Sequence, residues 1–70
     1  MSWSADRQVG LDAARRGDFA IALREFTPLA EQGNATAQLN LGSMYVLGQG
    51  VIQDNIYAHM WLNIAASNGS

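Results

Sequence analysis

Side chains suited to acid–base or metal chemistry are few and scattered in this 70-residue sequence. His59 is the single histidine, and the residues one helical turn away, Asn55 and Asn63, are poor metal ligands. The six acidic residues are dispersed, and no two of them form an evident general acid–base pair. We therefore predict no catalytic residue and no metal site, and we expect His59 to be a surface or interface residue.

The segment Gly48-Gln49-Gly50-Val51 contains two glycines but does not fit a phosphate-binding loop. No third glycine follows at the required spacing, and no strand is predicted before it. Asp54 follows this segment, and capping of the next helix is a sufficient role for it. The sequence has no cysteine, which excludes disulfides, thiolate metal ligands and a cysteine nucleophile. We therefore predict no cofactor, and we interpret the glycine segment as a turn.

Composition excludes several classes of partner. The net charge is −2, and the four basic residues are all arginines, too few and too scattered to neutralise a phosphate backbone. No apolar run approaches the roughly 18–20 residues of a membrane span. The first residues, MSWSADRQ, lack the features of a signal peptide, so we expect a cytoplasmic protein unless an upstream segment was removed.

Apolar residues at helical spacing, together with capping residues, predict four helices. We expect them at residues 3–16, 19–32, 35–47 and 55–69. The expected N-caps are Ser2 or Ser4, Asp18, Asn34 and Asp54. Gly42 lies in the middle of the third helix, where glycine costs about 1 kcal/mol relative to alanine. Its presence predicts that another helix backbone approaches closely at this point.

The two halves of the sequence resemble each other, which indicates an internal repeat. At one constant shift Asp18 aligns with Asp54, Ala22 with Ala58, Phe26 with Leu62, Ala30 with Ala66 and Gly33 with Gly69, and at a slightly shorter shift Gly10 aligns with Gly42. Each half is therefore a helix–turn–helix hairpin, and the second has the longer turn. We predict an all-α fold of two stacked hairpins, residues 1–34 and residues 35–70, which together form one domain.

The second half carries a motif with many fixed spacings. It consists of Ala37, Leu41-Gly42, Met44-Tyr45, Gly48-Gln-Gly50-Val51, Asp54, Ala58, Trp61, Ala65-Ala66 and Gly69. This motif resembles the Sel-1-like repeats, and the first half is similar to a short tetratricopeptide-type hairpin. Ile52 departs from the family pattern, which commonly has proline there. The resemblance implies an α-solenoid that holds other proteins or peptides in a scaffold or adaptor role, mostly without chemistry of its own.

The last predicted helix carries a wide apolar surface. Four of its residues are Tyr57, Met60, Trp61 and Ile64, and their counterparts in the first hairpin are Ile21, Arg24, Glu25 and Pro28, a partly charged set that water can cover. Burying a side chain such as that of Trp61 or Ile64 is worth roughly 1.5–3 kcal/mol. A large exposed apolar patch usually marks a contact surface. We therefore predict that these four residues contact a second copy of the chain or a further repeat.

A second candidate surface is the concave side, which the first helix of each hairpin lines in such solenoids. The positions expected there are Thr36, Asn40, Ser43 and Leu47 in the second hairpin and their equivalents Ser4, Gln8, Leu11 and Arg15 in the first. This polar, nearly uncharged strip suits hydrogen bonding to a peptide. The alternative is that these side chains are merely solvated.

The sequence thus predicts a non-catalytic protein–protein interaction module that self-associates, for example as a dimer, and binds proteins or peptides. One alternative is a fragment or capping unit of a longer repeat array in a larger regulatory or cell-envelope protein. A membrane-surface module is a remote alternative, because the last helix lacks the Lys/Arg face that binds anionic lipid. A hydrolase is equally remote, since the chain has no cysteine and one histidine.

Overall fold

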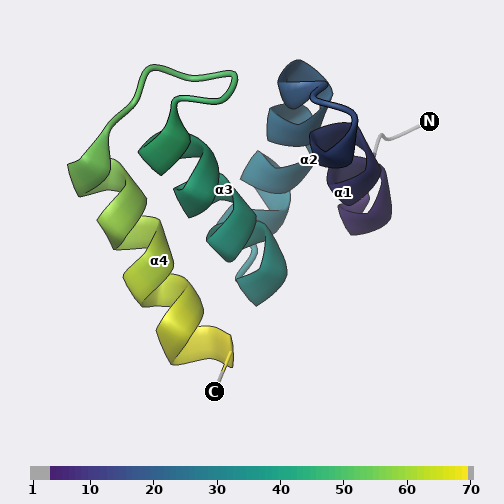
Figure 1. Cartoon of the computed structure of the whole chain (residues 1–70). Coiled ribbons are helices and arrows are strands. Elements are labelled where there is room, and N and C mark those ends of the chain that lie inside the picture. Colours follow the sequence, from purple (N-terminus) through teal and green to yellow (C-terminus); the bar gives the residue numbers. More distant parts are fainter. Residues whose placement is uncertain (1–3, 70) are drawn as a thin grey trace.

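The computed structural model describes residues 4–69, and all regular structure in this part of the chain is helical. The helices are α1 (Arg7–Arg15), α2 (Phe19–Glu31), α3 (Ala35–Leu47) and α4 (Asn55–Gly69). They lie side by side in chain order, from α1 at one edge to α4 at the other (Figure 1). Each helix packs mainly on the next helix in the chain. The predicted all-α fold is confirmed.

The beginning of α1 differs from the prediction. The helix starts at Arg7, and its N-cap is Asp6, whose Oδ1 accepts hydrogen bonds from the backbone N–H groups of Gln8 at 2.8 Å and Val9 at 3.3 Å. Ser4 lies before the helix in exposed, non-helical chain. The predicted cap Ser2 lies outside the described residues. A carboxylate has the advantage at this position because its charge also suits the positive end of the helix dipole.

The other helix ends follow the capping residues more closely. Asn34 accepts a hydrogen bond from the Ala37 N–H at 2.9 Å, and Gly48 ends α3 with a left-handed φ of 68°. Asp54 accepts a hydrogen bond from the Tyr57 N–H at 3.0 Å at the start of α4. Asp18 occupies the N-cap position of α2, but its side chain makes no capping hydrogen bond. The predicted N-caps are therefore confirmed at α3 and α4. At α2, Asp18 has the predicted position but does not make a capping hydrogen bond.

The core lies along the middle of the stack and combines small residues with a few large ones. Its buried members are Ala13, Ala22, Phe26, Ala30, Ala37, Leu41, Met44 and Trp61. Alanines bring the helix backbones close together, and the large side chains of Phe26, Leu41 and Trp61 fill the space that remains. One core therefore extends from α1 to α4 and joins the two hairpins.

Within each hairpin, the first helix presents a glycine to a large apolar side chain of the second helix. A Cβ atom placed on Gly10 would lie 2.8 Å from the ring of Phe26. A Cβ atom on Gly42 would lie 2.8 Å from the Leu62 side chain and 3.2 Å from the backbone oxygen of Ala58. The predicted close approach at Gly42 is confirmed, and the same contact recurs in both hairpins.

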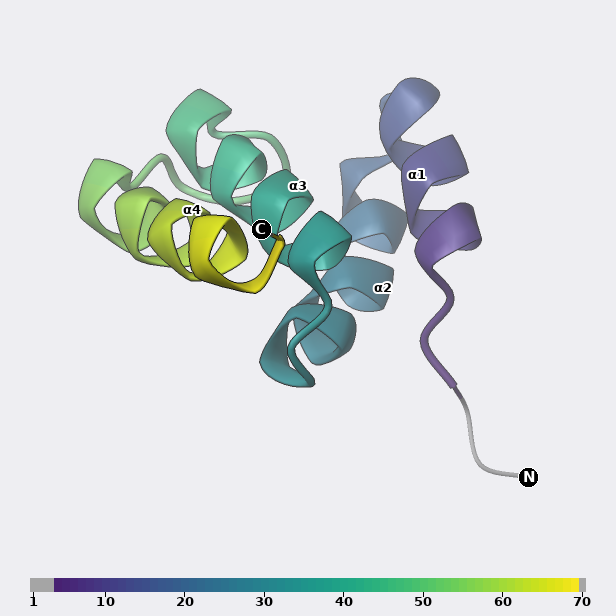
Figure 2. The same cartoon turned by 90° about the horizontal axis from the view of Figure 1, so that it is seen from below.

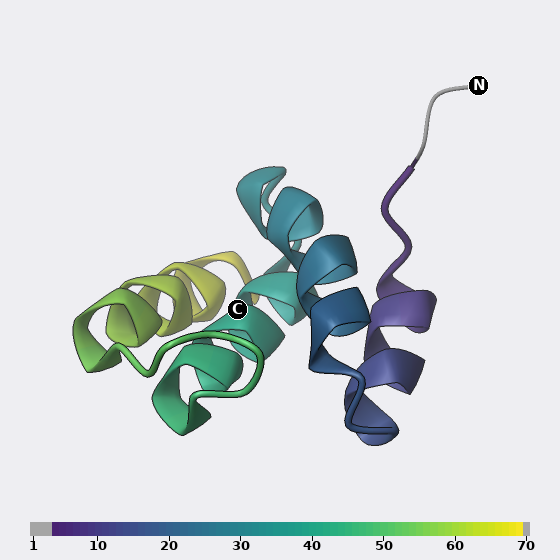
Figure 3. The ribbon, with the colours of Figure 1, turned by 90° about the horizontal axis from the view of Figure 1, so that it is seen from above.

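The loop between α3 and α4 also links the hairpins. The Asp54 N–H donates to the Tyr45 carbonyl oxygen at 3.0 Å, which closes the loop on itself. Gly50 adopts a φ of 75° and packs so closely on Phe19 that an added Cβ would lie 2.8 Å from the Phe19 Cβ. Figure 3 shows the loop reaching past α3 toward the start of α2. The second hairpin is thus fastened to the first at this end.

Candidate functional site

The described residues contain no cluster of side chains suited to metal binding. Within residues 4–69, no group of three or more His, Cys, Asp and Glu side chains could hold a metal ion. His59 lies on the exposed side of α4. Over the same residues, no helix combines the length and apolar character needed to cross a bilayer. The sites predicted from the sequence are surfaces.

The predicted contact residue Trp61 is not on the surface. Its side chain is only 8% exposed and belongs to the core cluster, and Ile64 is half-buried against the same cluster. The expected exposure of Trp61 is therefore wrong, because the chain's own helices already cover the indole ring. The counterpart position in the first hairpin, Glu25, is buried as well, at 2% exposure. This position thus faces the interior in both hairpins.

The other two predicted contact residues on α4 remain partly accessible. Tyr57 is 38% exposed and Met60 is 40% exposed. The Tyr57 ring makes edge-to-face contacts with Tyr45, at 4.7 Å between centroids, and with Trp61, at 6.1 Å. Burial raises the pKa of the Tyr45 hydroxyl above its ordinary value of 10.0, and the charges of Tyr57 and Asp54 add to this effect. This aromatic group holds Tyr57 in place at the surface.

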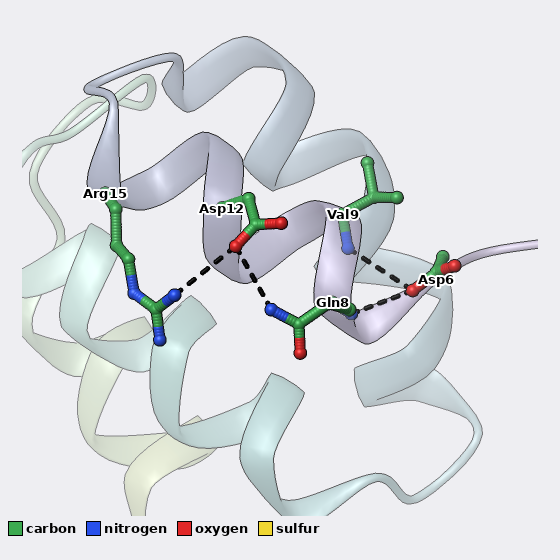
Figure 4. A network of polar contacts seen from close by, with 5 residues as sticks. All are labelled: Asp6, Gln8, Val9, Asp12 and Arg15. Carbon is green, nitrogen blue, oxygen red and sulfur yellow. Dashed lines mark hydrogen bonds and ion pairs between the residues drawn. The ribbon is translucent and has the colours of Figure 1, made fainter.

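On the first hairpin, the predicted concave residues form part of a hydrogen-bonded network along α1 (Figure 4). Asp12 Oδ1 accepts from Gln8 Nε2 at 3.1 Å and from the Arg15 guanidinium at 3.3 Å. Gln8 and Arg15 are exposed, whereas Leu11 is half-buried against the core. Leu11 therefore contributes to packing, and the exposed Gln8 and Arg15 side chains are both paired with Asp12.

On the second hairpin, the predicted concave residues are only partly accessible. Thr36, Asn40 and Ser43 are half-buried, and Leu47 is 65% exposed. Asn40 Nδ2 donates to the Thr36 carbonyl oxygen at 2.8 Å, which occupies one of the polar groups that a peptide would need. Contact of this strip with a peptide stays a prediction.

Glu25 is a buried carboxylate that holds the segment before α1, although the sequence predicts it on a solvated face. Glu25 Oε1 accepts a hydrogen bond from the Asp6 N–H at 2.9 Å, and its Oε2 accepts from Arg24 Nε at 3.1 Å. The expectation that water covers Glu25 is wrong, because the segment before α1 folds over it. A contact between residues so far apart in sequence leaves no local signal.

Gln38 is a second buried polar residue, and it joins three helices. Its Nε2 donates to the Ala30 carbonyl oxygen near the end of α2 at 3.0 Å. Its Oε1 accepts from Asn68 Nδ2 on α4 at 3.1 Å. Both ends of the buried amide are therefore paired, as a buried polar group requires. Gln38 fixes the spacing of α2, α3 and α4 at this end of the molecule.

An apolar groove lies between the first turns of α3 and the last turns of α4. It has a volume of about 440 Å³ and is lined by Ala35, Thr36, Leu39, Leu62, Ala65, Ala66 and Gly69. Figure 2 shows the end of α4 beside the start of α3, where Gly69 and Ala35 approach each other. None of the lining residues is charged, and Leu39 on its rim is 53% exposed.

The repeat explains why this groove is open. Leu62 and Ala66 on α4 are the counterparts of Phe26 and Ala30 on α2. Phe26 and Ala30 are 0% and 2% exposed in the core that α2 shares with α3, whereas Leu62 is half-buried and Ala66 is exposed. Sequence reasoning missed this groove, although the alignment of Phe26 with Leu62 was a signal that could have found it.

Two of three comparisons with known proteins gave a match. The family model of the Sel1 repeat matches residues 35–70. A relative of similar sequence is an uncharacterized protein of Neisseria meningitidis serogroup B, 53% identical over 34 residues. The match covers 49% of this chain and 7% of that protein, which is therefore much longer. No solved structure matches the chain.

Proposed function

Because the chain belongs to the Sel1 repeat family, we propose that it is a non-catalytic protein-binding module that self-associates through its second hairpin. Interaction with other proteins is the general role that this family membership suggests. The self-association is the more specific part of the proposal. Its contact surface includes Tyr57 and Met60, while Trp61 and Ile64 support that surface from beneath.

The observation that carries this proposal is the uneven distribution of exposed apolar side chains. Seven large apolar residues in the described part of the chain are substantially exposed, and all but Val9 belong to the second hairpin or its loop. They are Val9, Leu39, Leu47, Ile52, Ile56, Tyr57 and Met60. Ile52 and Ile56 are 91% and 87% exposed, which leaves most of their apolar surface in water. Exposed apolar surface concentrated in one hairpin of a small domain favours a contact surface.

Sedimentation equilibrium of the purified chain over a range of concentrations tests the self-association. We expect the average mass to rise above that of the 7.6 kDa monomer as concentration increases. The double substitution Ile56→Glu and Met60→Glu should abolish this rise. Both side chains are exposed, so the variant should keep its helical circular dichroism spectrum.

The double substitution Asn63→Glu and Ser67→Glu is the matched control, because it adds the same two charges at other exposed positions of α4. It should leave the association unchanged. A wild-type chain that stays monomeric at all concentrations would contradict self-association. Equal association of the Ile56→Glu and Met60→Glu variant and the wild type would contradict the assignment of the surface.

A second candidate function is favoured by the length of the Neisseria relative. Since the match spans 49% of this chain and 7% of that protein, a segment of similar sequence lies within a much longer chain. If the present chain is likewise part of a longer repeat array, further repeats would cover its second hairpin. Fusing an additional copy of residues 35–70 after Ser70 tests this candidate. Stacking predicts one cooperative unfolding transition at a higher temperature than that of the 70-residue chain, whereas an independent added unit would leave the transition temperature unchanged.

A further inference from the structure

We infer that the groove between α3 and α4 binds one uncharged helix of a partner protein, and that this helix must present a larger side chain to the groove than α3 presents to α2. The inference rests on the proposed protein-binding function and specifies the chemistry of the partner. The basis of the inference is the α2–α3 interface within the chain and the corresponding surface of α4 that lines the groove.

The existing interface is the one between α2 and α3. Phe26 and Ala30 of α2 share a fully buried cluster with Ala37 and Leu41 of α3. Their counterparts Leu62 and Ala66 line the groove on α4, and both hairpins have the same internal glycine contact beneath them. On its α4 side the groove thus continues the surface that α2 presents to α3, so an incoming helix would occupy the place on α4 that α3 occupies on α2.

The two surfaces differ in size. The position of Phe26 in the first hairpin is Leu62 in the second, and the position of Leu29 is Ala65. Both exchanges remove volume from the surface that an incoming helix would contact. Protein interiors are close-packed, and an unfilled void reduces stability. A helix with alanine at the position of Ala37 would leave part of the groove empty, whereas leucine there would fill it.

The absence of charge around the groove restricts the partner further. A charged side chain placed against Leu39, Leu62 and Ala66 would lose its hydration without gaining a charged partner among the lining residues. The helix of a second copy that corresponds to α3 is α1, and its apolar Val9 is bordered by Asp6 and Asp12. A second copy docked head to tail would bring these carboxylates to the groove. A separate, uncharged helix fits better.

Peptide binding to the intact chain tests this inference. The probes are two capped peptides with the sequence of residues 34–48, one unchanged and one carrying Ala37→Leu. Leucine and alanine have similar helix propensities, so the pair differs mainly in the size of the docking side chain. In titrations followed by amide chemical shifts, we expect the leucine peptide to bind about tenfold or more tightly than the unchanged peptide. The shifts should centre on Leu39, Leu62 and Ala66.

The variant Leu62→Phe provides the reciprocal measurement. A phenylalanine already lies opposite a glycine in the first hairpin, where Phe26 faces Gly10, so the variant should fold. It restores volume to the groove and should reverse the preference in favour of the unchanged peptide. A preference that is the same in Leu62→Phe and in the wild type would overturn the inference.

The remaining outcomes also decide between the proposals. Failure of both peptides to bind would overturn the inference, while a concentration-dependent mass in sedimentation would still support self-association. Peptide binding by a chain that stays monomeric would support the inference and contradict self-association. If a Leu39→Glu variant loses self-association and neither peptide competes with it in the wild type, the occupant is a second copy, and the separate partner helix is rejected.

Discussion

At the scale of single residues, Glu25 shows how one buried carboxylate can hold a terminal segment. It receives the Asp6 N–H and the Arg24 side chain, and both of its oxygens are therefore paired. We predict that Glu25→Ala lowers the free energy of unfolding by about 1–3 kcal/mol, because the Asp6 N–H loses its acceptor. Chemical denaturation measures this change, and hydrogen exchange should show faster opening of α1.

Two matched variants check the cause of that loss. Glu25→Gln keeps an acceptor oxygen at the same place and should cost less than alanine. Glu31→Gln removes a charge from an exposed position of the same helix and should change stability little. Equal losses in Glu25→Gln and Glu25→Ala would show that the charge, and not the hydrogen bond to Asp6, is what matters.

Tyr45 gives a prediction about alkaline stability. Its pKa is raised in the folded chain, chiefly by burial, so the unfolded chain releases the hydroxyl proton at lower pH than the folded chain does. The contribution of Tyr45 to stability is therefore complete below pH 10.0 and is lost as pH rises toward the folded pKa. Denaturation at increasing pH should show a decline that starts near pH 10.0 and is smaller in Tyr45→Phe. An identical decline in both proteins would refute this assignment.

At the scale of elements, the glycine contact inside each hairpin sets how closely its helices approach. We predict that Gly42→Ala destabilises the chain by about 1–3 kcal/mol, although alanine is the better helix former. The added methyl group would meet Leu62 at 2.8 Å and the Ala58 oxygen at 3.2 Å. Thermal unfolding measures the effect.

Leu62→Ala in the same chain should recover only part of that loss, because the backbone oxygen of Ala58 cannot move away as a side chain can. Gly69→Ala is the comparison variant, since a methyl group there would make only an ordinary contact at 3.7 Å with Ala35. A stabilising effect of Gly42→Ala would contradict the prediction, because it would mean that α3 and α4 can move apart without losing packing energy.

The accuracy of the sequence-based element predictions follows from where the signals lie. The bounds of α3 were predicted correctly because Asn34 and Gly48 mark its ends locally. The start of α1 was placed too early, because Ser2 and Ser4 are capping residues too, and only the fold shows that Asp6 bonds to Gln8 and Val9. A capping residue in the sequence thus predicts a helix end correctly where no second capping residue lies nearby.

The sites were harder to predict than the fold, and α4 shows the reason. Its sequence is apolar on nearly every side, so periodicity could not tell the face toward the core from the face toward the groove. Trp61 was consequently assigned to the surface, and Leu62 was not recognised as a lining residue. The error at Trp61 also depended on Glu25, whose burial arises from a contact with the distant Asp6.

At the scale of the whole molecule, Trp61 connects the second hairpin to the shared core. We predict that Trp61→Glu unfolds the chain, because losing the buried indole costs about 3–5 kcal/mol and an unpaired buried charge costs about 3–5 kcal/mol more, whereas a domain of this size has only about 4–10 kcal/mol of stability. Circular dichroism should show loss of helix. Trp61→Phe should be far milder, since the indole N–H has no acceptor among the described residues and its removal sacrifices no hydrogen bond. A folded, helical Trp61→Glu chain would contradict the buried position.

The polar network on α1 also limits how copies of this chain can join. A filament grows only if the surface at one end of a subunit complements the surface at the other end of its neighbour. At one end of this chain, α1 displays Asp6, Gln8, Asp12 and Arg15, which are bonded among themselves. The other end carries the uncharged groove between α3 and α4. We therefore expect this mismatch to oppose head-to-tail polymerisation, because each contact would bring the carboxylates of α1 against the apolar groove.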